Sequence, residues 1–344
     1  MGTSHEMLTT TLDTRVVQNR IMNISDMPTE VQRRVRMTIS CRDCDSIPKV
    51  HDAGDIYTFN DERVQIMHNG VRIIEGCYCG AWMTEIIRQS RGHHEPQEEL
   101  AFHIIVERLR TDTPNPRMIE LGAYWSYYSL WLLQRIPTAS TYMVEPDPDY
   151  LEAGRRNIML NGRKGTFLQA AVGRVAMPPS LFRCESDGVR RSIQTESLPS
   201  LFERFGLGHA DIVLADIQGA EMGMLEGAAK LLDEKRVRFL VVSTHHHSIS
   251  GDPLTHQHCL EFLKSRGAHI VAEHSIRESY SGDGLVAVSF DPRDDIIAEI
   301  SYARARDSLY GEVEIELAHC DEQRQIAERR TAALESQLRE TRKS

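Results

Sequence analysis

A regular alternation of apolar runs and helical patterns over residues 95–290 places the strongest restriction on the fold of this chain. Strands that alternate with helices build βαβ units, and such units assemble a mostly parallel sheet with helices on both faces. The sequence therefore predicts an α/β fold with a doubly wound, mostly parallel sheet. The expected strands lie in MIEL, TYMVE, TFLQAAV, DIVLAD, RFLVVST, AHIVAEH and GLVAVSF. The expected helices lie near residues 127–136, 148–160, 222–232 and 256–266, after a first helix in PQEELAFHIIVERL.

Two further segments flank this domain. Residues 1–94 form an N-terminal extension, whose first part, residues 1–60, is polar and weakly periodic, so we expect loosely attached structure there without chemical function. The dipeptide Asn69-Gly70 separates two β-prone runs and predicts a β-hairpin near residues 64–74, because both residues tolerate positive φ angles. Residues 291–344 are rich in Ala, Glu, Arg and Gln, which predicts a long C-terminal helix and a candidate coiled coil for homo-oligomer formation.

Composition restricts the class of partner. The formal net charge is -10, which argues against nucleic acid as a substrate. No run approaches the roughly 18 apolar residues that a membrane-spanning helix needs. The start of the chain lacks the basic and apolar regions of a signal peptide, so we expect a cytoplasmic protein. The seven cysteines form no dense framework, and reduced thiols are expected.

The segment MIELGAYWSYYSL carries the first candidate cofactor residues. A strand is expected to end at Glu120, and Gly122 allows the sharp turn into the following helix, as in nucleotide-binding sheets. A dinucleotide site would need further glycines for the pyrophosphate, but Tyr124 and Ser126 occupy those places. S-adenosylmethionine has no pyrophosphate, so the sequence favours it over a nicotinamide cofactor. Tyr124 is expected to line the pocket and to offer its ring for stacking.

The next two strands supply further candidates for the same cofactor. Glu145 follows the second strand, where a carboxylate can accept hydrogen bonds from both ribose hydroxyls. Its alternative role is that of a solvated loop residue or helix cap. Gln169 and Ala170 follow the third strand, where a side-chain amide or a backbone group could recognise the adenine edge.

In this order, the segments resemble the FkbM-type methyltransferases, whose members generally contain D-x-G-A-N-x-G-x-Y-S, E-P, A-x-G and K-x-D-V-E-G-A-E. The similarity covers residues 95–290 and is carried by ELGAYWSYYSL, VEPDP, QAAVG and DIVLADIQGAEMGMLEGA. It implies a Rossmann-like methyltransferase fold, S-adenosylmethionine as methyl donor, and oxygen acceptors on sugars or other small hydroxylated molecules. Five positions depart from the family pattern, namely Glu120 for Asp, Tyr124 for Asn, Ser126 for Gly, Leu214 for Lys and Gln218 for Glu.

Methyl transfer to a hydroxyl group requires removal of its proton, and two further strand ends offer candidates. Asp216 follows the fourth strand and is expected to face both the cofactor and the acceptor. His245 and His247 follow the fifth strand and would share one face if that strand continued. Asp216 with these histidines can form a general base, or Asp216 and His245 can hold a divalent metal, and the sequence leaves both alternatives open. For Glu221 we favour a helix-capping role.

The function that these observations predict is O-methylation of a sugar, glycan or similar small hydroxylated metabolite. A non-catalytic cofactor-binding or scaffold protein is the alternative, since Leu214 and Gln218 remove family charges. A nicotinamide-dependent oxidoreductase is disfavoured by the missing glycines. A zinc site made of Cys41, Cys44, Cys77 and Cys79 is also disfavoured, because Cys-x-Cys is a strained spacing and the segments are not finger-like.

Overall fold

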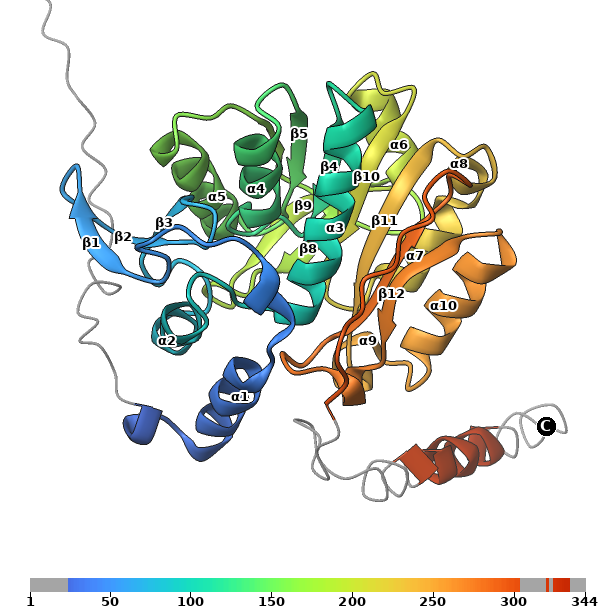
Figure 1. Cartoon of the computed structure of the whole chain (residues 1–344). Coiled ribbons are helices and arrows are strands. Elements are labelled where there is room, and N and C mark those ends of the chain that lie inside the picture. The colour runs from blue at the N-terminus through green and yellow to red at the C-terminus, as the bar shows by residue number, and fades with distance from the viewer. Residues whose placement is uncertain (1–23, 304–319, 322–323, 335–344) are drawn as a thin grey trace, which may run out of the picture.

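The computed structural model describes residues 24–303, 320–321 and 324–334. Its centre is a seven-stranded sheet in which only β13 runs antiparallel to its neighbours (Figure 1). The predicted doubly wound, mostly parallel sheet is thus confirmed. In spatial order the strands are β12 (His269–His274), β13 (Gly284–Ser289), β11 (Val237–Thr244), β10 (Ala210–Ala215), β4 (Arg117–Leu121), β5 (Ser140–Val144) and β6 (Thr166–Leu168).

The central strands are apolar along their whole length because both faces of the sheet are covered. In β10, Ile212 and Leu214 point into one hydrophobic core, whereas Val213 and Ala215 point into the other. All eight residues of β11 are buried. Strands buried on both faces read as continuous apolar runs rather than as alternating patterns, which explains why DIVLAD and RFLVVST were recognisable in the sequence.

Helices of the chain divide between the two faces of the sheet. One core contains apolar side chains of α3 (Pro96–Asp112), α4 (Tyr127–Arg135) and α5 (Pro148–Leu160). The other contains those of α6 (Leu198–Arg204), α7 (Glu221–Gly227), α8 (Ala229–Asp233) and α10 (Thr255–Ser265). The single helix expected over residues 222–232 is therefore two short helices. Among the helices that the structure describes, none has the length and apolar character needed to cross a bilayer.

The strand order changes direction between β4 and β10. From β4 the chain proceeds outward through β5 and β6, and it then returns to β10 and β11 on the other side of β4. Ligands of doubly wound sheets bind outside the carboxyl ends of the strands at such a switch point. The candidate site therefore lies beyond the ends of β4, β10 and their neighbours.

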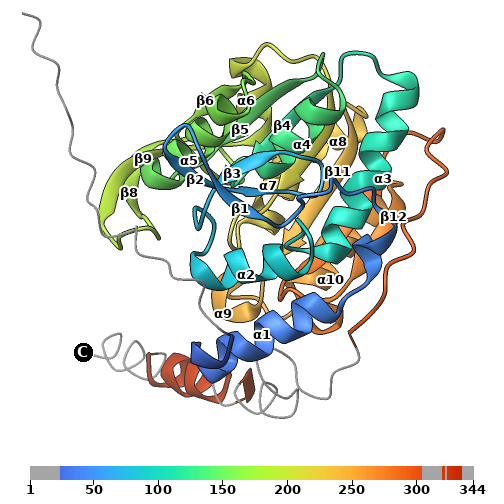
Figure 2. The ribbon, with the colours of Figure 1, turned by 60° about the vertical axis from the view of Figure 1, so that its left-hand side comes forward.

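The N-terminal region is packed against the domain from residue 24 onward (Figure 2). Met27 and Val35 belong to the same hydrophobic core as α3, so the expected loose attachment of residues 1–60 is wrong for this part. The predicted hairpin is confirmed, since Val64 in β2 pairs with Ile74 in β3. The elements are η2 (Ile24–Asp26), α1 (Thr29–Ser40), η3 (Asp43–Ser46), β1 (Ile56–Phe59), β2 (Glu62–Ile66), β3 (Arg72–Ile74) and α2 (Ala81–Gln89).

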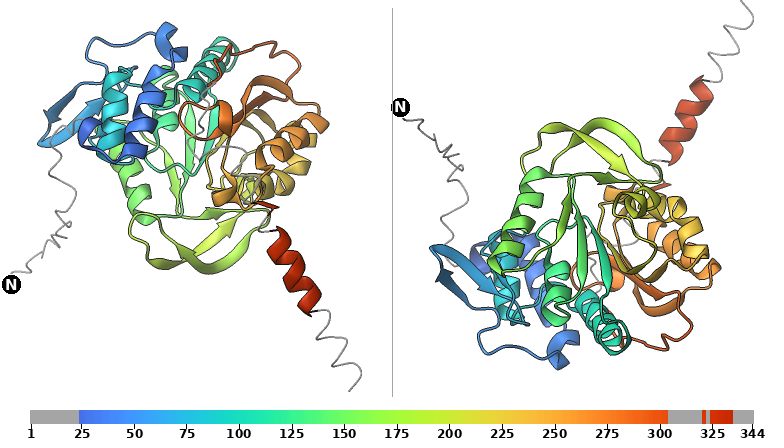
Figure 3. Two further views of the ribbon diagram at one scale, coloured as in Figure 1. Left: turned by 90° about the horizontal axis from the view of Figure 1, so that it is seen from below. Right: turned by 90° about the horizontal axis from the view of Figure 1, so that it is seen from above.

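A second small sheet follows the third strand of the domain. It contains β7 (Ala171–Val172), β9 (Arg190–Glu196) and β8 (Met177–Arg183), and its β8–β9 hairpin extends along one side of the molecule (Figure 3). The expected strand TFLQAAV is consequently split, because β6 belongs to the central sheet and β7 to this one. Residues 169 and 170 lie at the break.

The C-terminal segment differs from the expected helix over residues 291–344. Residues 291–303 contain no helix and run beside β12, where the Ala298 N–H donates to the Val271 carbonyl at 2.8 Å. Buried Asp294 holds this segment against the sheet through an ion pair with Arg238 at 2.6 Å. Helix is present at residues 320–321 and 324–334. The remaining residues of the predicted helix lie outside the described parts of the chain, and its coiled coil stays a prediction.

Candidate functional site

The turn after β4 brings the ends of β4 and β10 into contact. Gly122 has a φ of +72°, and a Cβ atom at this position would lie 1.7 Å from the carbonyl oxygen of Asp216. The Asp216 N–H donates to the Leu121 carbonyl at 3.0 Å. Only glycine fits this approach, because it accepts a positive φ and has no side chain to clash. The turn therefore places Gly122 and Asp216, two predicted site residues, at the switch point of the sheet.

Glu145 fixes the corner between the first turn and the second strand. Its carboxylate accepts hydrogen bonds from the backbone N–H groups of Tyr124 at 3.0 Å and Asp147 at 2.9 Å. Burial, the largest influence, raises the pKa of Glu145 to about 8 in spite of these two donors. The Ala170 N–H lies 3.3 Å from the Glu145 carbonyl oxygen. The structure thus brings Tyr124, Glu145 and Ala170 together, and their shared role in cofactor binding stays a prediction.

Two residues of the turn after β4 adopt positive φ angles, which are unfavourable for residues other than glycine. Tyr124 has a φ of 39° and Ser126 a φ of 60°, and Ser126 begins α4 without a side-chain cap. The ring of Tyr124 stacks on that of Tyr150, with centroids 3.6 Å apart. Ser126 packs against α5, where a Cβ on Gly154 would lie 2.4 Å from the Ser126 hydroxyl oxygen. The two departures from the family pattern are therefore held in place by α5.

Glu120 and Gln169, two other predicted cofactor residues, form hydrogen bonds with the protein backbone. Glu120 is buried, and its carboxylate accepts the N–H of Ser129 in the first turn of α4 at 3.1 Å, so it satisfies a free donor of that helix. Burial raises the pKa of Glu120 to about 7. Gln169 is exposed, and its amide donates to the Pro146 carbonyl at 3.2 Å. The structure therefore gives Glu120 and Gln169 partners within the protein.

A buried histidine and two carboxylates meet beyond the ends of β10 and β11. His245 Nδ1 lies 2.6 Å from Glu221 Oε1, and His245 Nε2 lies 3.1 Å from Asp216 Oδ1. Glu221 Oε1 also accepts the Gly219 N–H at 2.9 Å, so this residue both orders the turn and orients the imidazole. The expected capping role of Glu221 was therefore incomplete. A carboxylate on Nδ1 fixes the tautomer and leaves Nε2 facing Asp216.

His245 Nε2 and Asp216 Oδ1 keep unused bonding capacity. His245 Nε2 and Asp216 Oδ1 are buried and form an ion pair, but neither makes an aligned hydrogen bond. Burial disfavours the charged imidazole, yet the contacts with Asp216 and Glu221 outweigh it and hold the pKa of His245 well above its ordinary value. The imidazole therefore carries a proton more readily than an exposed histidine. Both atoms therefore have the chemistry to bind a hydroxyl group or a cation.

Asp283 is a site residue that the sequence did not reveal. Its carboxylate Oδ1 lies 3.9 Å from His245 Nε2, on the loop that leads into β13. Burial raises the pKa of Asp283, while the charge of His245 lowers it. Its only sequence signal is its place between Gly282 and Gly284, which is too weak to select it. The contact depends on the antiparallel return of β13 beside β11.

The expected partnership of His245 and His247 is wrong. Strand β11 ends at Thr244, and His246 is the N-cap of the short helix α9 (His247–Ser250). The His246 side chain accepts the Ser248 N–H at 3.2 Å. The strand alternation that would have placed His245 and His247 on one face therefore stops before it reaches them. His247 stacks on His246 instead, with ring centroids 3.9 Å apart.

Comparisons with known proteins give one family match and several distant structural likenesses. Residues 118–270 match the methyltransferase FkbM domain family. No curated protein sequence matched the chain. Similar solved structures include the precorrin-6y C5,15-methyltransferase from Geobacter metallireducens, at 15% identity and a TM-score of 0.34, covering 55% of this chain and 86% of that one. The METTL16 MTase domain has 15% identity and a TM-score of 0.39, covering 66% of this chain and 86% of that one.

A third similar structure is that of TrmK from M. capricolum in complex with S-adenosylhomocysteine. It has 12% identity and a TM-score of 0.34, covering 59% of this chain and 76% of that one. These likenesses are distant, and the assignment rests on the family match. That match begins in β4 and ends in β12, so it contains the turn at Gly122, the corner at Glu145 and His245 with Asp216 and Glu221, but not Asp283. Residues 118–270 are a methyltransferase FkbM domain, and the chain is an S-adenosylmethionine-dependent methyltransferase.

Proposed function

We propose that this methyltransferase transfers the methyl group to a hydroxyl oxygen of a sugar, glycan or similar small hydroxylated metabolite. The observation that carries the proposal is the ion pair between His245 Nε2 and Asp216 Oδ1, 3.1 Å apart at the carboxyl edge of the sheet, in which neither atom makes an aligned hydrogen bond. An alcohol requires a base for its proton, whereas an amine or thiol needs less help. A buried imidazole held by Glu221 suits that requirement.

Residues 95–290 form the catalytic domain in this proposal, with residues 1–94 as an N-terminal extension. S-adenosylmethionine supplies an activated methyl group when it is bound. Glu145 fits its ribose, since both carboxylate oxygens retain a lone pair beyond the bonds from Tyr124 and Asp147. The cofactor would also lie along Gly122, Tyr124 and Ala170. Glu120 and Gln169, which have partners within the protein, would contribute through the shape of the pocket.

The roles of His245, Glu221 and Asp216 follow from the distances between their side chains. His245 Nε2 would accept the proton of the acceptor hydroxyl as the oxygen forms its bond to the methyl carbon and the carbon–sulfur bond breaks. Glu221, at 2.6 Å from Nδ1, would stabilise the resulting imidazolium. Asp216 would orient the hydroxyl group beside Nε2. The acceptor must therefore bind between the cofactor and the end of β11.

A divalent metal is the second way to activate the hydroxyl group. Asp216 and His245, whose facing atoms lie 3.1 Å apart, offer a carboxylate and an imidazole, which are donors that suit such an ion, and Asp283 Oδ1 lies 3.9 Å from His245 Nε2. Glu221 behind His245 matches the carboxylate that commonly orients a metal-bound histidine. A bound metal would lower the pKa of the acceptor hydroxyl. Activity that survives exhaustive chelation supports the base, and activity that is lost and then restored by a divalent ion supports the metal.

The test is methyl transfer from labelled S-adenosylmethionine to a panel of sugars and glycans, with the linkage of each product identified by mass spectrometry. We expect an O-methyl product. His245→Gln should lower turnover by about 100-fold or more, while His247→Gln, whose side chain stacks on His246, should retain most of it. Labelled nitrogen or sulfur products would contradict the proposal. Cofactor binding without transfer to any acceptor would favour a scaffold protein.

Leu214 and Gln218, which replace charged residues of the family pattern, bear on whether the chain is a non-catalytic scaffold protein. Leu214 is buried in the core beneath the crevice, and Gln218 is exposed. Neither contributes to the contacts among Asp216, Glu221 and His245, which are complete without the family charges. The net charge of -10 also supports a small-molecule or glycan acceptor in the cytoplasm rather than nucleic acid.

A further inference from the structure

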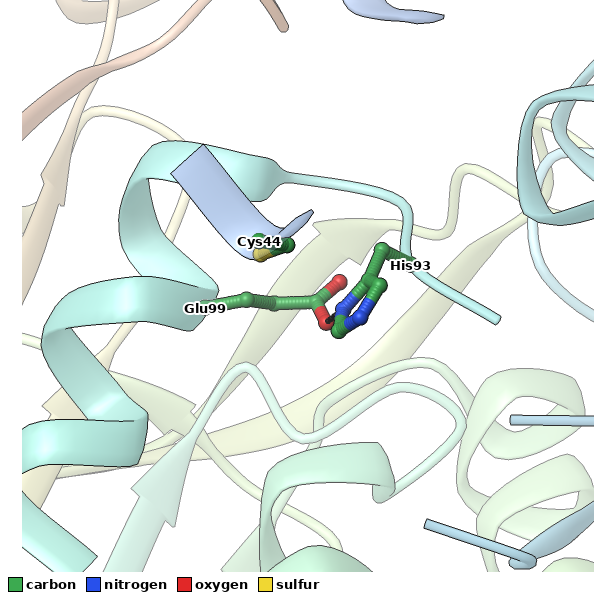
Figure 4. A group of neighbouring side chains, drawn as sticks. All are labelled: Cys44, His93 and Glu99. Carbon is green, nitrogen blue, oxygen red and sulfur yellow. Dashed lines mark hydrogen bonds and ion pairs between the residues drawn. The ribbon is translucent and has the colours of Figure 1, made fainter. Parts of the chain in front are cut away.

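A second group of buried donor atoms lies where the N-terminal segment meets the start of α3. Cys44 of η3, His93 of the loop after α2 and Glu99 of α3 point toward one another (Figure 4). One potential ligand atom from each residue lies within 4.8 Å of the other two. All three residues are buried, with Glu99 fully enclosed. The group thus joins three separate segments of the chain.

Glu99 is the centre of this group. Its Oε2 lies 2.5 Å from His93 Nδ1, and its Oε1 accepts the backbone N–H of His94 at 2.7 Å. The Cys44 thiol donates to the Pro96 carbonyl at 3.1 Å. These contacts fix the carboxylate and hold the sulfur beside it. The donor atoms are therefore already gathered before any ligand enters.

One imidazole nitrogen of this group has no hydrogen-bond partner among the described residues. His93 Nε2 is buried and makes no hydrogen bond, whereas the neighbouring His94 Nδ1 forms an ion pair with Glu99 Oε1 at 2.6 Å. Buried polar atoms are nearly always satisfied in folded proteins, and exceptions point to an ion, a water molecule or a functional role. The site therefore has bonding capacity that the protein alone does not use.

We propose that Cys44, His93 and Glu99 bind a structural zinc ion. Thiolate, imidazole and carboxylate are the three common zinc ligands, with bond lengths of about 2.0 to 2.3 Å. As the zinc–sulfur bond forms, the thiol S–H bond breaks and its proton passes to solvent. The proton shared by His93 Nδ1 and Glu99 leaves in the same way. His94 Nδ1 is not one of the three ligands and instead forms an ion pair with Glu99 Oε1 at 2.6 Å.

The proposed zinc differs from the four-cysteine site considered from the sequence. Cys41 contacts Ser301 at 3.7 Å, and the Cys77 sulfur accepts a hydrogen bond from Asn157 at 3.5 Å. Of these four cysteines, only Cys44 belongs to the proposed site. Its partners there are His93 and Glu99, which lie far along the chain. The ion would tie η3 to α3 and would hold the N-terminal segment against the methyltransferase domain.

The test uses the full chain with any affinity tag removed, stripped of metal by a chelator and then titrated with cobalt and zinc. We expect one ion per chain, with the near-ultraviolet charge-transfer absorption of a cobalt–thiolate bond. Cys44→Ser should abolish this absorption and weaken metal affinity at least tenfold. Cys184→Ser, which changes another buried cysteine, should leave both unchanged. Asp216→Asn should also retain the absorption, which separates this site from a metal in the crevice.

Two results would overturn the proposal. One is a wild-type chain that takes up neither metal, and the other is a charge-transfer absorption that persists in Cys44→Ser. Circular dichroism establishes whether the variant folds. If it does not, Glu99→Gln serves instead, and it should weaken metal affinity at least tenfold while the cobalt–thiolate absorption remains. Unchanged affinity in Glu99→Gln would equally contradict the site.

Discussion

His245 Nδ1 lies 2.6 Å from Glu221 Oε1, and neither side chain is more than 1% exposed. Together with Asp216, Glu221 holds the pKa of His245 well above its ordinary value against the effect of burial. A general base acts in its neutral form, and that form becomes more abundant as the pH rises toward the pKa. The empty enzyme therefore holds its base largely protonated near neutral pH.

We therefore expect kcat/KM to keep rising with pH above neutrality. Glu221→Gln removes one of the charges that support the imidazolium, so the rising part of the profile should move to lower pH by about one unit or more. Its maximal rate should also fall, because the amide stabilises the imidazolium less well. The measurement is kcat/KM across the pH range for both proteins. Superimposable profiles would show that Glu221 does not act through His245.

Glu145 gives a second pH dependence, in cofactor binding. Ribose hydroxyls donate to the carboxylate, so they favour its charged form, and the pKa of Glu145 in the empty site is about 8. Affinity for S-adenosylhomocysteine should therefore increase as the pH rises toward that value, by up to about tenfold per unit. Glu145→Gln should weaken binding by roughly 1 to 3 kcal/mol and make it nearly independent of pH.

The control for this prediction is Glu152→Gln, an exposed change on the adjacent helix α5. It should bind the cofactor as the wild type does, with the same pH dependence. Thermal unfolding checks that Glu145→Gln remains folded, since it loses one of the two acceptors that hold the turn. Wild-type affinity that does not vary with pH would remove Glu145 from the ribose site.

Gly122 and Gly162 form a matched pair for testing the switch-point contact. Both have a positive φ, but a Cβ on Gly122 would lie 1.7 Å from the Asp216 carbonyl oxygen, and one on Gly162 would meet nothing within 4 Å. Gly162→Ala should lower the free energy of unfolding by about 1 kcal/mol. Gly122→Ala should lower it by more than about 3 kcal/mol. Chemical denaturation measures both, and equal losses would exclude the close approach.

Ser126 occupies a position where the family commonly has glycine. Its φ of 60° is unfavourable for a side chain, and its buried hydroxyl has no hydrogen-bond partner. Ser126→Gly should therefore raise the free energy of unfolding by about 1 kcal/mol. Ser129→Gly removes a similar hydroxyl within helix α4 and should instead lower it by about 1 kcal/mol. A loss of stability in Ser126→Gly would show that its side chain contributes packing that outweighs the strain.

The central sheet was predictable because its strands are buried on both faces. Such strands appear as unbroken apolar runs, and the helices between them begin with recognisable signals such as Pro96 and Pro148. Strand ends then located Glu145, Asp216 and His245 near one edge. Local sequence is sufficient for these features, since each depends on its own strand and turn.

Features that depend on contacts between distant segments were missed. Glu221 reaches His245 across two strand ends, and Asp283 arrives on a loop from β12 to β13. The helix α1 is mostly polar, and only Val35 and Thr38 of its residues are buried. In β8, almost every side chain is exposed, and two prolines interrupt it. The only local signal for that hairpin was Asp187-Gly188.

The most direct test of the whole account is calorimetric titration of the full chain with S-adenosylhomocysteine, with NAD as the comparison ligand. A site built around Gly122, Glu145 and the end of β10 predicts one S-adenosylhomocysteine bound per chain and no measurable binding of NAD. Binding should be weakened by Glu145→Gln and retained by His245→Gln. Absence of S-adenosylhomocysteine binding, or binding of NAD in its place, would contradict the assigned cofactor and with it the proposed methyl transfer.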